Sequence, residues 1–308
     1  MSAENAKIIL GTRGSELARA QTRLVEEAIR SASPHRTIET KVIATHGDKG
    51  RTLDPAAGRK GLFTAEIERA LVAGEVDVAV HSAKDLPSET TPGVEITSVL
   101  PRAPVQDALI SKHFGGLASL PGGATLATGS VRRKHQLLWK RPDLKLIDLR
   151  GNVPTRLRKL AENNWDAIVL ARAGLHRLGM SVNAKINFDD RVFFVDVLPV
   201  ETFLPAGGQG IIALQIRAGD ERTSAVVDLV NDPGTLLCLQ AERQFLGALH
   251  GDCNCPVGVL AQIHDGRMRM RAQLFRGETT VPREAEVAGA FNEGDKLAAE
   301  LLRRIQQE

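Results

Sequence analysis

The chain has 308 residues, of which 43% are hydrophobic and 25% are charged, and its formal net charge is +3. This length allows two or three globular domains, and this composition is ordinary for such domains. The small net charge excludes a globally basic chain, and the apolar runs, such as residues 167–170 and 210–214, are too short to cross a bilayer.

The first hundred residues show alternating strand and helix patterns. We expect strands at 7–12, 39–45, 76–80 and 94–100, and helices at 15–31 and 62–73. Ser15 is a suitable N-cap, so the first helix would direct its N–H groups toward the end of the first strand. Residues 46–61 are rich in Gly, Lys, Arg and Asp, and they are expected to form a loop of the length of an active-site lid.

A second run of alternating elements begins after Pro101-Arg-Ala-Pro104, which is expected to be a hinge. The pattern predicts strands at 108–111, 125–128, 145–149 and 167–170, with helices at 131–140 and 153–162. The glycine-rich residues 204–210 then cross back and lead into a strand at 211–216.

The last third has a different pattern. Helices are expected at 224–231, 236–249 and 297–306, and strands at 257–263 and 268–274. Asp265-Gly266 between the two strands is a strong hairpin signal. These elements predict a small α+β unit.

Lys84 and Asp85 follow the buried strand at 76–80. Ligands in open α/β sheets lie just beyond the carboxyl ends of strands, so chemistry is expected here. Alone, Asp85 would be interpreted as a turn or N-cap residue. As the one acid within a cationic set, it is better explained as a group that stabilises a developing cation or accepts a proton.

Arginines follow three other expected strand ends, in groups that contain Arg13, Arg132 with Arg133, and Arg150 with Arg156. A single group of this kind would be interpreted as solvated surface. Cations are disfavoured in the first turn of a helix, so three groups in such places favour an anion site, because Arg binds carboxylate and phosphate well. Lys60, Lys84, Arg172 and Arg177 are further candidates.

Cys253 and Cys255 lie between an expected helix and an expected strand. Zinc is a weak interpretation, because only His250 and His264 are near, and no metal site is predicted. A loop cysteine beside Gly and Pro is more exposed than a structural one, and it could serve as a nucleophile or as a covalent tether. Cys238, in an apolar helix, is expected in the core. An odd number of cysteines fits a reducing compartment.

Several segments together resemble the porphobilinogen deaminase (hydroxymethylbilane synthase) family. They cover nearly the whole chain in the family's order. They are GTRGS (11–15), KGLF (60–63), HSAKDLP (81–87), SVRR (130–133), LRGNVPTRL (149–157), ARAGLHRLG (171–179), PAGGQG (205–210) and CNCPVG (253–258).

The resemblance implies an α/β fold with two periplasmic-binding-protein-like domains around a cleft and a small C-terminal α+β domain. The implied ranges are 1–102 with 202–221 for the first domain, 103–201 for the second and 222–308 for the third. The first would carry the catalytic Asp and the lid loop, the second an arginine-rich wall, and the third a cofactor-bearing cysteine.

The implied activity is that of a transferase in tetrapyrrole and haem biosynthesis. Such an enzyme deaminates and condenses four porphobilinogen molecules head to tail on a dipyrromethane primer, and hydrolysis releases hydroxymethylbilane. The primer is joined by a thioether to a cysteine three positions before a proline, which selects Cys253. The family also implies a monomer that acts on a small molecule. The N-terminus shows no signal-peptide pattern, so a cytoplasmic location is expected, and the short apolar runs and modest charge predict no membrane and no nucleic-acid partner.

The resemblance also assigns roles to single residues. Asp85 would be the catalytic carboxylate, bind pyrrole N–H groups and stabilise the cation left when ammonia departs. Cofactor contacts would come from Lys84, Asp85, Ser130, Arg132, Arg133, Arg150 and Arg156. Substrate contacts would come from Arg13, Ser15, Lys60, Phe63, Thr128, Arg150, Arg156 and Arg177.

Three departures from the family pattern are present. Gly129 stands where a serine is usual, so one hydroxyl contact is expected to be lost. Asp252 adds a negative charge beside Cys253, which is expected to raise the thiol pKa and slow cofactor attachment. Cys255 is an extra thiol at which attachment could also occur.

Two alternatives of other classes are a non-catalytic anion-binding module and a nucleic-acid binder. The first would need neither Asp85 nor Cys253, and its mass would equal the sequence mass. The second is disfavoured by the modest net charge and by an aromatic content of only 4%.

Overall fold

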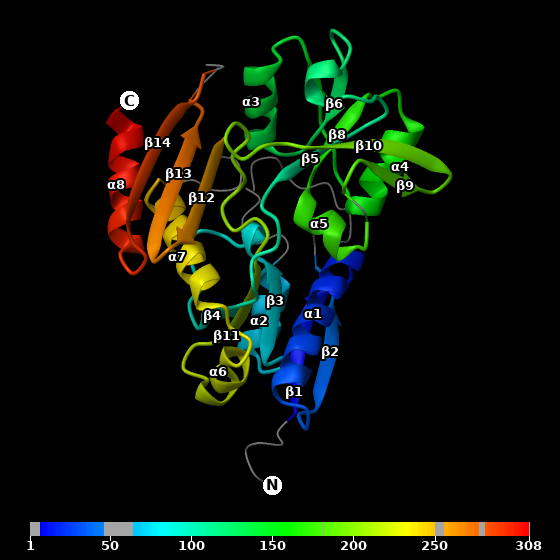
Figure 1. Ribbon diagram of the computed structural model, residues 1–308. Helices are drawn as coiled ribbons and strands as arrows, with labels where there is room; N and C mark the ends of the chain where they lie inside the picture. Colours follow the sequence, from blue (N-terminus) through cyan, green and yellow to red (C-terminus); the bar gives the residue numbers. More distant parts are fainter. Residues whose placement is uncertain (1–6, 46–63, 181, 250–255, 277–280, 308) are drawn as a thin grey trace.

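Three β-sheets, each with its own helices, organise this mixed α/β chain (Figure 1). The computed structural model describes residues 7–45, 64–180, 182–249, 256–276 and 281–307. The first two sheets form the lower and upper parts of the view in Figure 1, and the third lies beside them on the left.

The first sheet has the strand order β2-β1-β3-β11-β4. Its strands are β1 (Ile8–Arg13), β2 (Ile38–Ile43), β3 (Val78–Ser82), β4 (Val94–Val99) and β11 (Ile212–Arg217). Strands β1, β2 and β3 run parallel, and β11 is antiparallel to both β3 and β4. The ends of β1 and β3, which Arg13 and the Lys84–Asp85 pair follow, therefore share one edge of the sheet.

Helices α1 (Glu16–Ala32), α2 (Ala65–Val72) and α6 (Glu221–Asp228) pack on this sheet. The Ser15 hydroxyl accepts a hydrogen bond from the Ala18 N–H, which confirms Ser15 as the N-cap of α1. Val25 and Ile29 of α1 are fully buried against the sheet, because they recur at helical spacing on one face.

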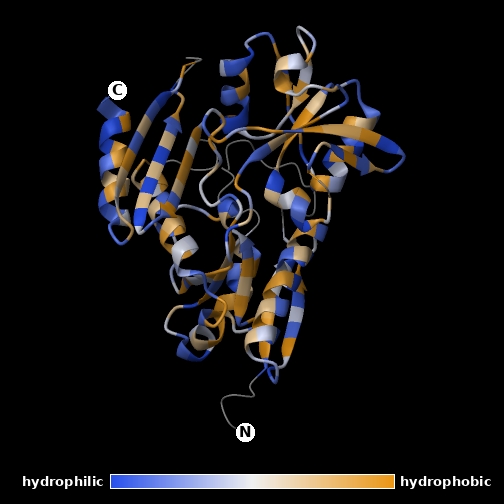
Figure 2. Cartoon of the chain, in the orientation of Figure 1, coloured by the Kyte–Doolittle hydropathy of each residue, from blue (hydrophilic) through white to orange (hydrophobic). Residues whose placement is uncertain are grey.

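The second sheet has the order β7-β6-β8-β5-β10-β9. Its strands are β5 (Asp107–Ser111), β6 (Thr125–Ala127), β7 (Lys145–Ile147), β8 (Ala167–Ala171), β9 (Lys185–Phe188) and β10 (Arg191–Val197). Its strands are largely hydrophobic (Figure 2), because helices cover them. The helices are α3 (Val131–Lys140), α4 (Val153–Glu162) and α5 (Arg172–Arg177).

The direction of β5 places Asp107 at the sheet edge where ligands are expected. Strands β6, β7 and β8 run parallel, whereas β5 is antiparallel to β8 and pairs Asp107 with Ala171. Asp107, at the start of β5, therefore lies at the edge where β6, β7 and β8 end.

The third sheet has the order β12-β13-β14, with β12 (Val257–His264), β13 (Arg267–Leu274) and β14 (Arg283–Ala290). The predicted hairpin is confirmed, since Asp265 and Gly266 join β12 to β13 with φ angles of 50° and 71°, as a type I′ turn requires. Helices α7 (Pro233–Ala248) and α8 (Gly294–Gln307) pack on this unit. In the described part of the chain, no helix is long and apolar enough to span a membrane.

An ion pair joins the expected hinge to the third unit. Arg102 donates from its two terminal nitrogens to the fully buried Glu242 of α7, at 2.7 and 3.2 Å. Glu242 also accepts from the backbone N–H groups of Gly208 and Ala261. One carboxylate thus binds the hinge, the glycine-rich crossing segment and β12.

The domain ranges stay a prediction. The sheets use residues 8–99 with 212–217, then 107–197, then 257–290. Helix α6, which the expected boundary at 221/222 gives to the third unit, packs against β4 and β11 of the first sheet. Its packing therefore places it with the first unit.

Candidate active site

Lys84 and Asp85 lie in a 3₁₀ turn, Ala83–Asp85, directly after β3. The Asp85 side chain is exposed, whereas Lys84 is half-buried. The charge of Asp85 acts electrostatically on Lys84 and on Arg156 of α4, a helix of the second unit. The carboxylate therefore faces the space where the edges of the first two sheets meet.

Asp107 binds both members of the arginine pair. Its Oδ2 accepts from Arg132 Nη2 at 2.8 Å and its Oδ1 accepts from Arg133 Nη2 at 2.6 Å. Asp107 is fully buried, and each arginine is about 95% buried. Burial opposes ionisation of Asp107, but the two guanidinium groups outweigh it and hold its pKa well below the usual range.

This arrangement corrects the expectation of a single acid among the cations. Arg132 and Arg133 do not lie free on a wall, because a buried charge requires a partner and Asp107 supplies it. The pair therefore presents less than two full positive charges to a ligand.

Gln209 connects this pair to Lys84. Its Nε2 donates to Asp107 Oδ1 at 2.9 Å, and its Oε1 accepts from Lys84 Nζ at 3.4 Å. Gly208 permits this approach: its φ is +73°, and an added Cβ would lie 2.9 Å from the Lys84 backbone nitrogen. The glycine-rich segment thus brings an amide side chain between the two sheets.

Burial dominates the titration of the side chains near Asp85. It lowers the pKa of Lys84 to about 8, aided by Arg133 and partly offset by Asp85 and Asp107. It also lowers the pKa of Arg156 to about 10, again aided by Arg133. Burial lowers the pKa of His81 to about 4, so this ring is neutral at pH 7.

The side-chain hydroxyls of the candidate residues accept hydrogen bonds from backbone N–H groups. Ser15 caps α1, and Ser130 caps α3 by accepting from the Arg133 N–H at 3.5 Å. The buried Thr128 hydroxyl accepts from the Ser130 N–H at 3.3 Å. These contacts fix the turns before the two helices.

The remaining arginine candidates differ in exposure. Arg156 Nε donates to the Gly151 carbonyl, and Arg177 donates to the Gly210 carbonyl at 2.6 Å. Burial lowers the pKa of Arg177 to about 10. Arg150, between β7 and α4, is exposed. The charge of Arg13 acts on His81, which places Arg13 on the Asp85 side.

Gly129 has a steric reason for its departure from the family pattern. A Cβ added there would lie 2.6 Å from the Leu149 carbonyl oxygen. A serine at this position would therefore require the backbone to move.

Of the three cysteines, only Cys238 lies among the described residues. Cys238 is 5% exposed in the core of the third unit, as predicted, and burial raises its pKa to about 12. Cys253, Cys255, Asp252, Lys60 and Phe63 lie outside the described residues. Among the residues that the structure describes, no cluster of His, Cys, Asp or Glu could hold a metal ion.

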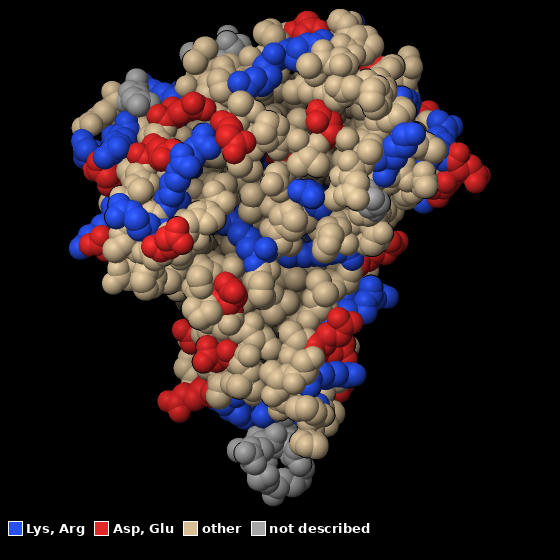
Figure 3. Space-filling view, in the orientation of Figure 1, with Lys and Arg blue, Asp and Glu red and all other residues tan. Residues whose placement is uncertain are grey.

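The charge at this site is predominantly positive. Lys84, Arg132, Arg133 and Arg156 stand with Asp85 and Asp107, and we call these six residues the cationic cluster. Figure 3 shows Lys and Arg at the surface where the upper and lower parts meet. Asp107 and Gln209 were missed by sequence reasoning. An acid beginning an otherwise apolar strand was a signal for Asp107, but Gln209 gave none.

Comparisons with known proteins agree over most of the chain. Residues 8–225 match the family model described as porphobilinogen deaminase, dipyromethane cofactor binding domain, and residues 236–303 match porphobilinogen deaminase, C-terminal domain. The porphobilinogen deaminases of Roseiflexus sp. (strain RS-1) and Syntrophomonas wolfei are each 42% identical to this chain. In both, the match covers 96% of this chain and 95% of the relative.

Among solved structures, the methionine binding protein MetQ is similar with a TM-score of 0.44 and 13% identity. That match covers 79% of this chain and 91% of MetQ.

Proposed function

Because this chain belongs to the porphobilinogen deaminase family, we propose that Asp85 is its catalytic carboxylate and that the cationic cluster binds the acidic side arms of the pyrroles. The observation that carries the proposal is the placement of Asp85 directly after β3, within electrostatic range of Lys84 and of Arg156 in α4.

The reaction defines what the site must do. The chain is a transferase that deaminates porphobilinogen, condenses four molecules on a dipyrromethane primer and releases hydroxymethylbilane. Each pyrrole carries an acetate and a propionate, so the growing product is a polyanion.

The described residues fit the dipyrromethane group. The Nε atoms of Arg132 and Arg133 are buried and have no hydrogen-bond partner among the described residues. Four cations of the cluster also face only two carboxylates. Added carboxylates would supply the missing negative charge. When bound, the group supplies the primer to which pyrrole rings are joined.

We assign its attachment to Cys253. Cys238 is unsuited, because its thiol is buried and the raised pKa keeps it protonated at pH 7. That leaves Cys253 and Cys255, and the family pattern of a cysteine three positions before a proline favours Cys253.

Asp85 can act in two ways. As an exposed carboxylate it can accept hydrogen bonds from pyrrole N–H groups and stabilise the positive charge that develops when ammonia leaves the substrate. It can also accept the proton lost from the ring carbon after coupling. His81 of β3 is buried and hydrogen-bonded to Gln215, and Lys84 is a cation at pH 7, so the exposed Asp85 is the accessible proton acceptor at this strand end.

The other candidates would contact the cofactor or the substrate. Lys84, Arg132, Arg133, Arg150, Arg156 and Ser130 are assigned to the cofactor. Arg13, Ser15, Lys60, Phe63, Thr128, Arg150, Arg156 and Arg177 are assigned to the substrate. Of these, Lys84 and Arg156 are best supported, because both are electrostatically coupled to Asp85.

We also propose a cytoplasmic monomer with no nucleic-acid partner. The odd number of cysteines supports the reducing compartment. The net charge of +3 and the low aromatic content support the absence of a nucleic-acid partner. Sedimentation equilibrium would measure the oligomeric state.

Replacing Asp85 tests the catalytic assignment. Asp85→Ala is expected to fold normally and to lower turnover of porphobilinogen by about 10²–10⁴-fold, the usual contribution of a positioned acid–base group. Asp190→Ala, in the exposed β9–β10 turn, is the control and should retain parental turnover. Turnover near the parental value in Asp85→Ala would remove Asp85 from the mechanism.

Intact-protein mass spectrometry tests the attachment site. Parent, Cys255→Ser and Cys238→Ala should each carry the added mass of a dipyrrole, and Cys253→Ser should not. An adduct on Cys253→Ser would move the attachment to Cys255, and a parent without an adduct would overturn the proposed function.

A further inference from the structure

A chain of hydrogen bonds links the arginine pair to the third sheet. Arg132 Nη1 donates to Gln136 Oε1 at 2.7 Å, and Gln136 Nε2 donates to Gln273 Oε1 at 2.6 Å. Gln273 Nε2 then donates to Glu284 Oε1 at 2.7 Å. Gln136 is fully buried and Gln273 is 2% exposed. Two amides thus connect α3 to β13 and β14.

Every bond in this relay is donated in the same direction. It starts at a guanidinium group and ends at a carboxylate, so the charges at both ends favour a single orientation of each amide. If either amide were turned over, its NH₂ group would face the preceding N–H donor and its oxygen would face the next acceptor. The relay therefore holds α3 and β13 in one relative position.

The relay ends close to the strand that follows the cysteine segment. Gln273 is paired with Gly258 in the β12–β13 ladder. The neighbouring Val259 N–H donates to the Pro205 carbonyl at 3.0 Å, and the Leu204 carbonyl accepts from both Arg132 and Gln136. The crossing segment, α3 and the start of β12 therefore meet at one point.

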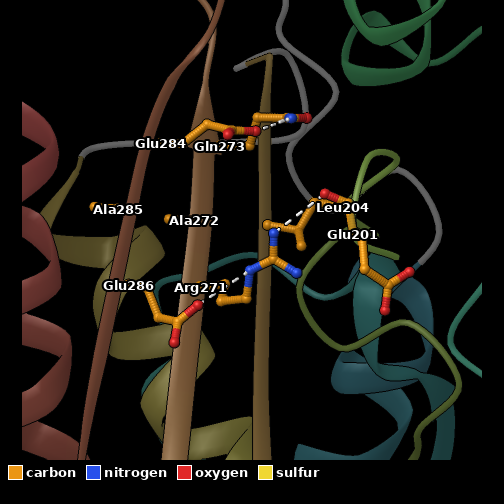
Figure 4. Close-up of a pocket in the computed structure, with 8 residues that line it drawn as sticks. All are labelled: Glu201, Leu204, Arg271, Ala272, Gln273, Glu284, Ala285 and Glu286. Carbon is orange, nitrogen blue, oxygen red and sulfur yellow. Dashed lines mark hydrogen bonds and ion pairs between the residues drawn. The ribbon is translucent and has the colours of Figure 1, made fainter. Parts of the chain in front are cut away.

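Polar contacts rather than apolar packing hold part of this junction. A cavity of about 190 Å³ separates β13 and β14 from residues 201–204 (Figure 4). Gln273 and Glu284 lie at one end of it, and Arg271 reaches across to the Glu201 carbonyl at 3.2 Å. The Arg271–Glu201 hydrogen bond spans this space, and Phe275 packs against His135 and Trp139 of α3 at the end of β13.

We propose that Gln136 and Gln273 are positioning residues, which hold the arginine pair at a fixed distance from the start of β12 so that the pair meets the cofactor attached to the preceding segment. The inference rests on the proposed function. Neither glutamine touches the reacting atoms, because both act through Arg132 and through the third sheet.

A double substitution separates positioning from stability. In Gln136→Met/Gln273→Met, Arg132 Nη1 and the Leu204 carbonyl still bind each other, and the exposed Glu284 is solvated by water. No described buried group loses its last partner, so the urea midpoint should stay near the parental value. Gln136→Met alone leaves the buried Gln273 Oε1 without its described donor and should be less stable, whereas in Gln273→Met the Gln136 amide keeps Arg132 and the Leu204 carbonyl.

The measurement is the rate at which apoprotein gains the dipyrrole mass. Apoprotein is made in cells that produce no porphobilinogen, mixed with porphobilinogen and followed by intact-protein mass spectrometry. The double variant should load about tenfold more slowly than the parent. Gln262→Met, on the exposed part of β12, is the control and should load at the parental rate.

Each other outcome is decisive. Loading of the double variant within twofold of the parent would overturn the inference and leave the proposed function intact. Slow loading together with a clearly lowered urea midpoint would mean that the glutamines act only on stability, and it would also overturn the inference. A parent that never gains mass would overturn the proposed function together with this inference.

Discussion

Lys84 and Asp85 are adjacent in sequence but lie in different environments. Asp85 is exposed, whereas Lys84 is half-buried beside Arg133 and contacts Gln209. Burial and a neighbouring like charge both disfavour its ammonium form. The charged Lys84 therefore lowers the stability of the folded chain, and a bound carboxylate would offset this loss.

This environment predicts a pH-dependent stability. The pKa of Lys84 is about 8 in the folded chain and near 10.5 in the unfolded chain, so between these values the unfolded chain binds more protons and stability rises with pH. Lys84→Met should stabilise the apoprotein by about 1–2 kcal/mol at pH 7, with the gain vanishing toward pH 10.5. Urea unfolding at pH 7 and pH 10 measures this.

Raising the pH has the opposite effect on substrate binding by Lys84: it stabilises the fold but weakens the binding of carboxylates. The KM of the parent for porphobilinogen should rise between pH 7 and pH 9, as Lys84 loses its charge. Lys84→Met should show a raised KM that changes less over this range. A variant with parental KM at pH 7 would contradict the assignment of Lys84 to a carboxylate.

The places of Lys84 and Asp85 at the end of β3 could be predicted from the sequence, whereas their roles stay a prediction. They were singled out because ligands in open α/β sheets lie beyond the carboxyl ends of strands. Gln136, Gln209 and Gln273 were missed, because a glutamine in a helix, loop or strand has no distinctive pattern, and its role depends on partners more than 60 residues away.

At the scale of elements, α3 and α4 both begin without an acid in the first turn. Arginines there are opposed by the helix dipole. In α3, Asp107 from β5 supplies the counter-charge, which is possible because β5 runs antiparallel to β8 and so starts at the edge where the neighbouring strands end.

Removing that counter-charge should destabilise the protein strongly. Asp107→Asn leaves two buried guanidinium groups without an anion, and a loss of about 3–5 kcal/mol is expected. Asp148→Asn removes the exposed partner of Lys134 and should cost about 1 kcal/mol or less. Urea unfolding compares the two, and equal losses would contradict a special role for Asp107.

Helices and strands with a strong local sequence pattern were predicted, and those with a weak pattern were missed. Helix α4 was predicted with the bounds that the structure shows, since Asn152 caps it and Pro154 begins it. Strand β14 was missed, because Ala, Glu and Gly are poor strand formers and its pairing with β13 creates it. Strands β9 and β10 were overlooked, although the run at 191–197 is rich in Val and Phe.

At the scale of the whole molecule, Glu242 binds the hinge, the crossing segment and β12 at once. It belongs to α7 and is fully buried. An uncharged side chain at this point could not satisfy all of these donors, so Glu242 is one of the main contacts that position the third unit against the hinge and the crossing segment.

Glu242→Gln should therefore loosen the third unit first. Trp165 belongs to the second unit, but Trp139 contacts Phe275 of the third unit, so the variant and its control are made in a Trp139→Phe background. There, fluorescence reports the second unit and far-UV circular dichroism reports all three. In urea, the dichroism transition of the variant should precede the fluorescence transition. The control Glu286→Gln, at an exposed pair with Arg269, should keep the two transitions coincident, and coincidence in Glu242→Gln would contradict the prediction.

The position of β11 affects how the chain is made on the ribosome. β11 separates β3 from β4, yet its residues 212–217 are synthesised after all six strands of the second sheet, which end at residue 197. The nascent chain can finish the inserted sheet while β3 and β4 still have unpaired edges. Until residue 217 has emerged, those open edges are the part of the growing chain most exposed to aggregation.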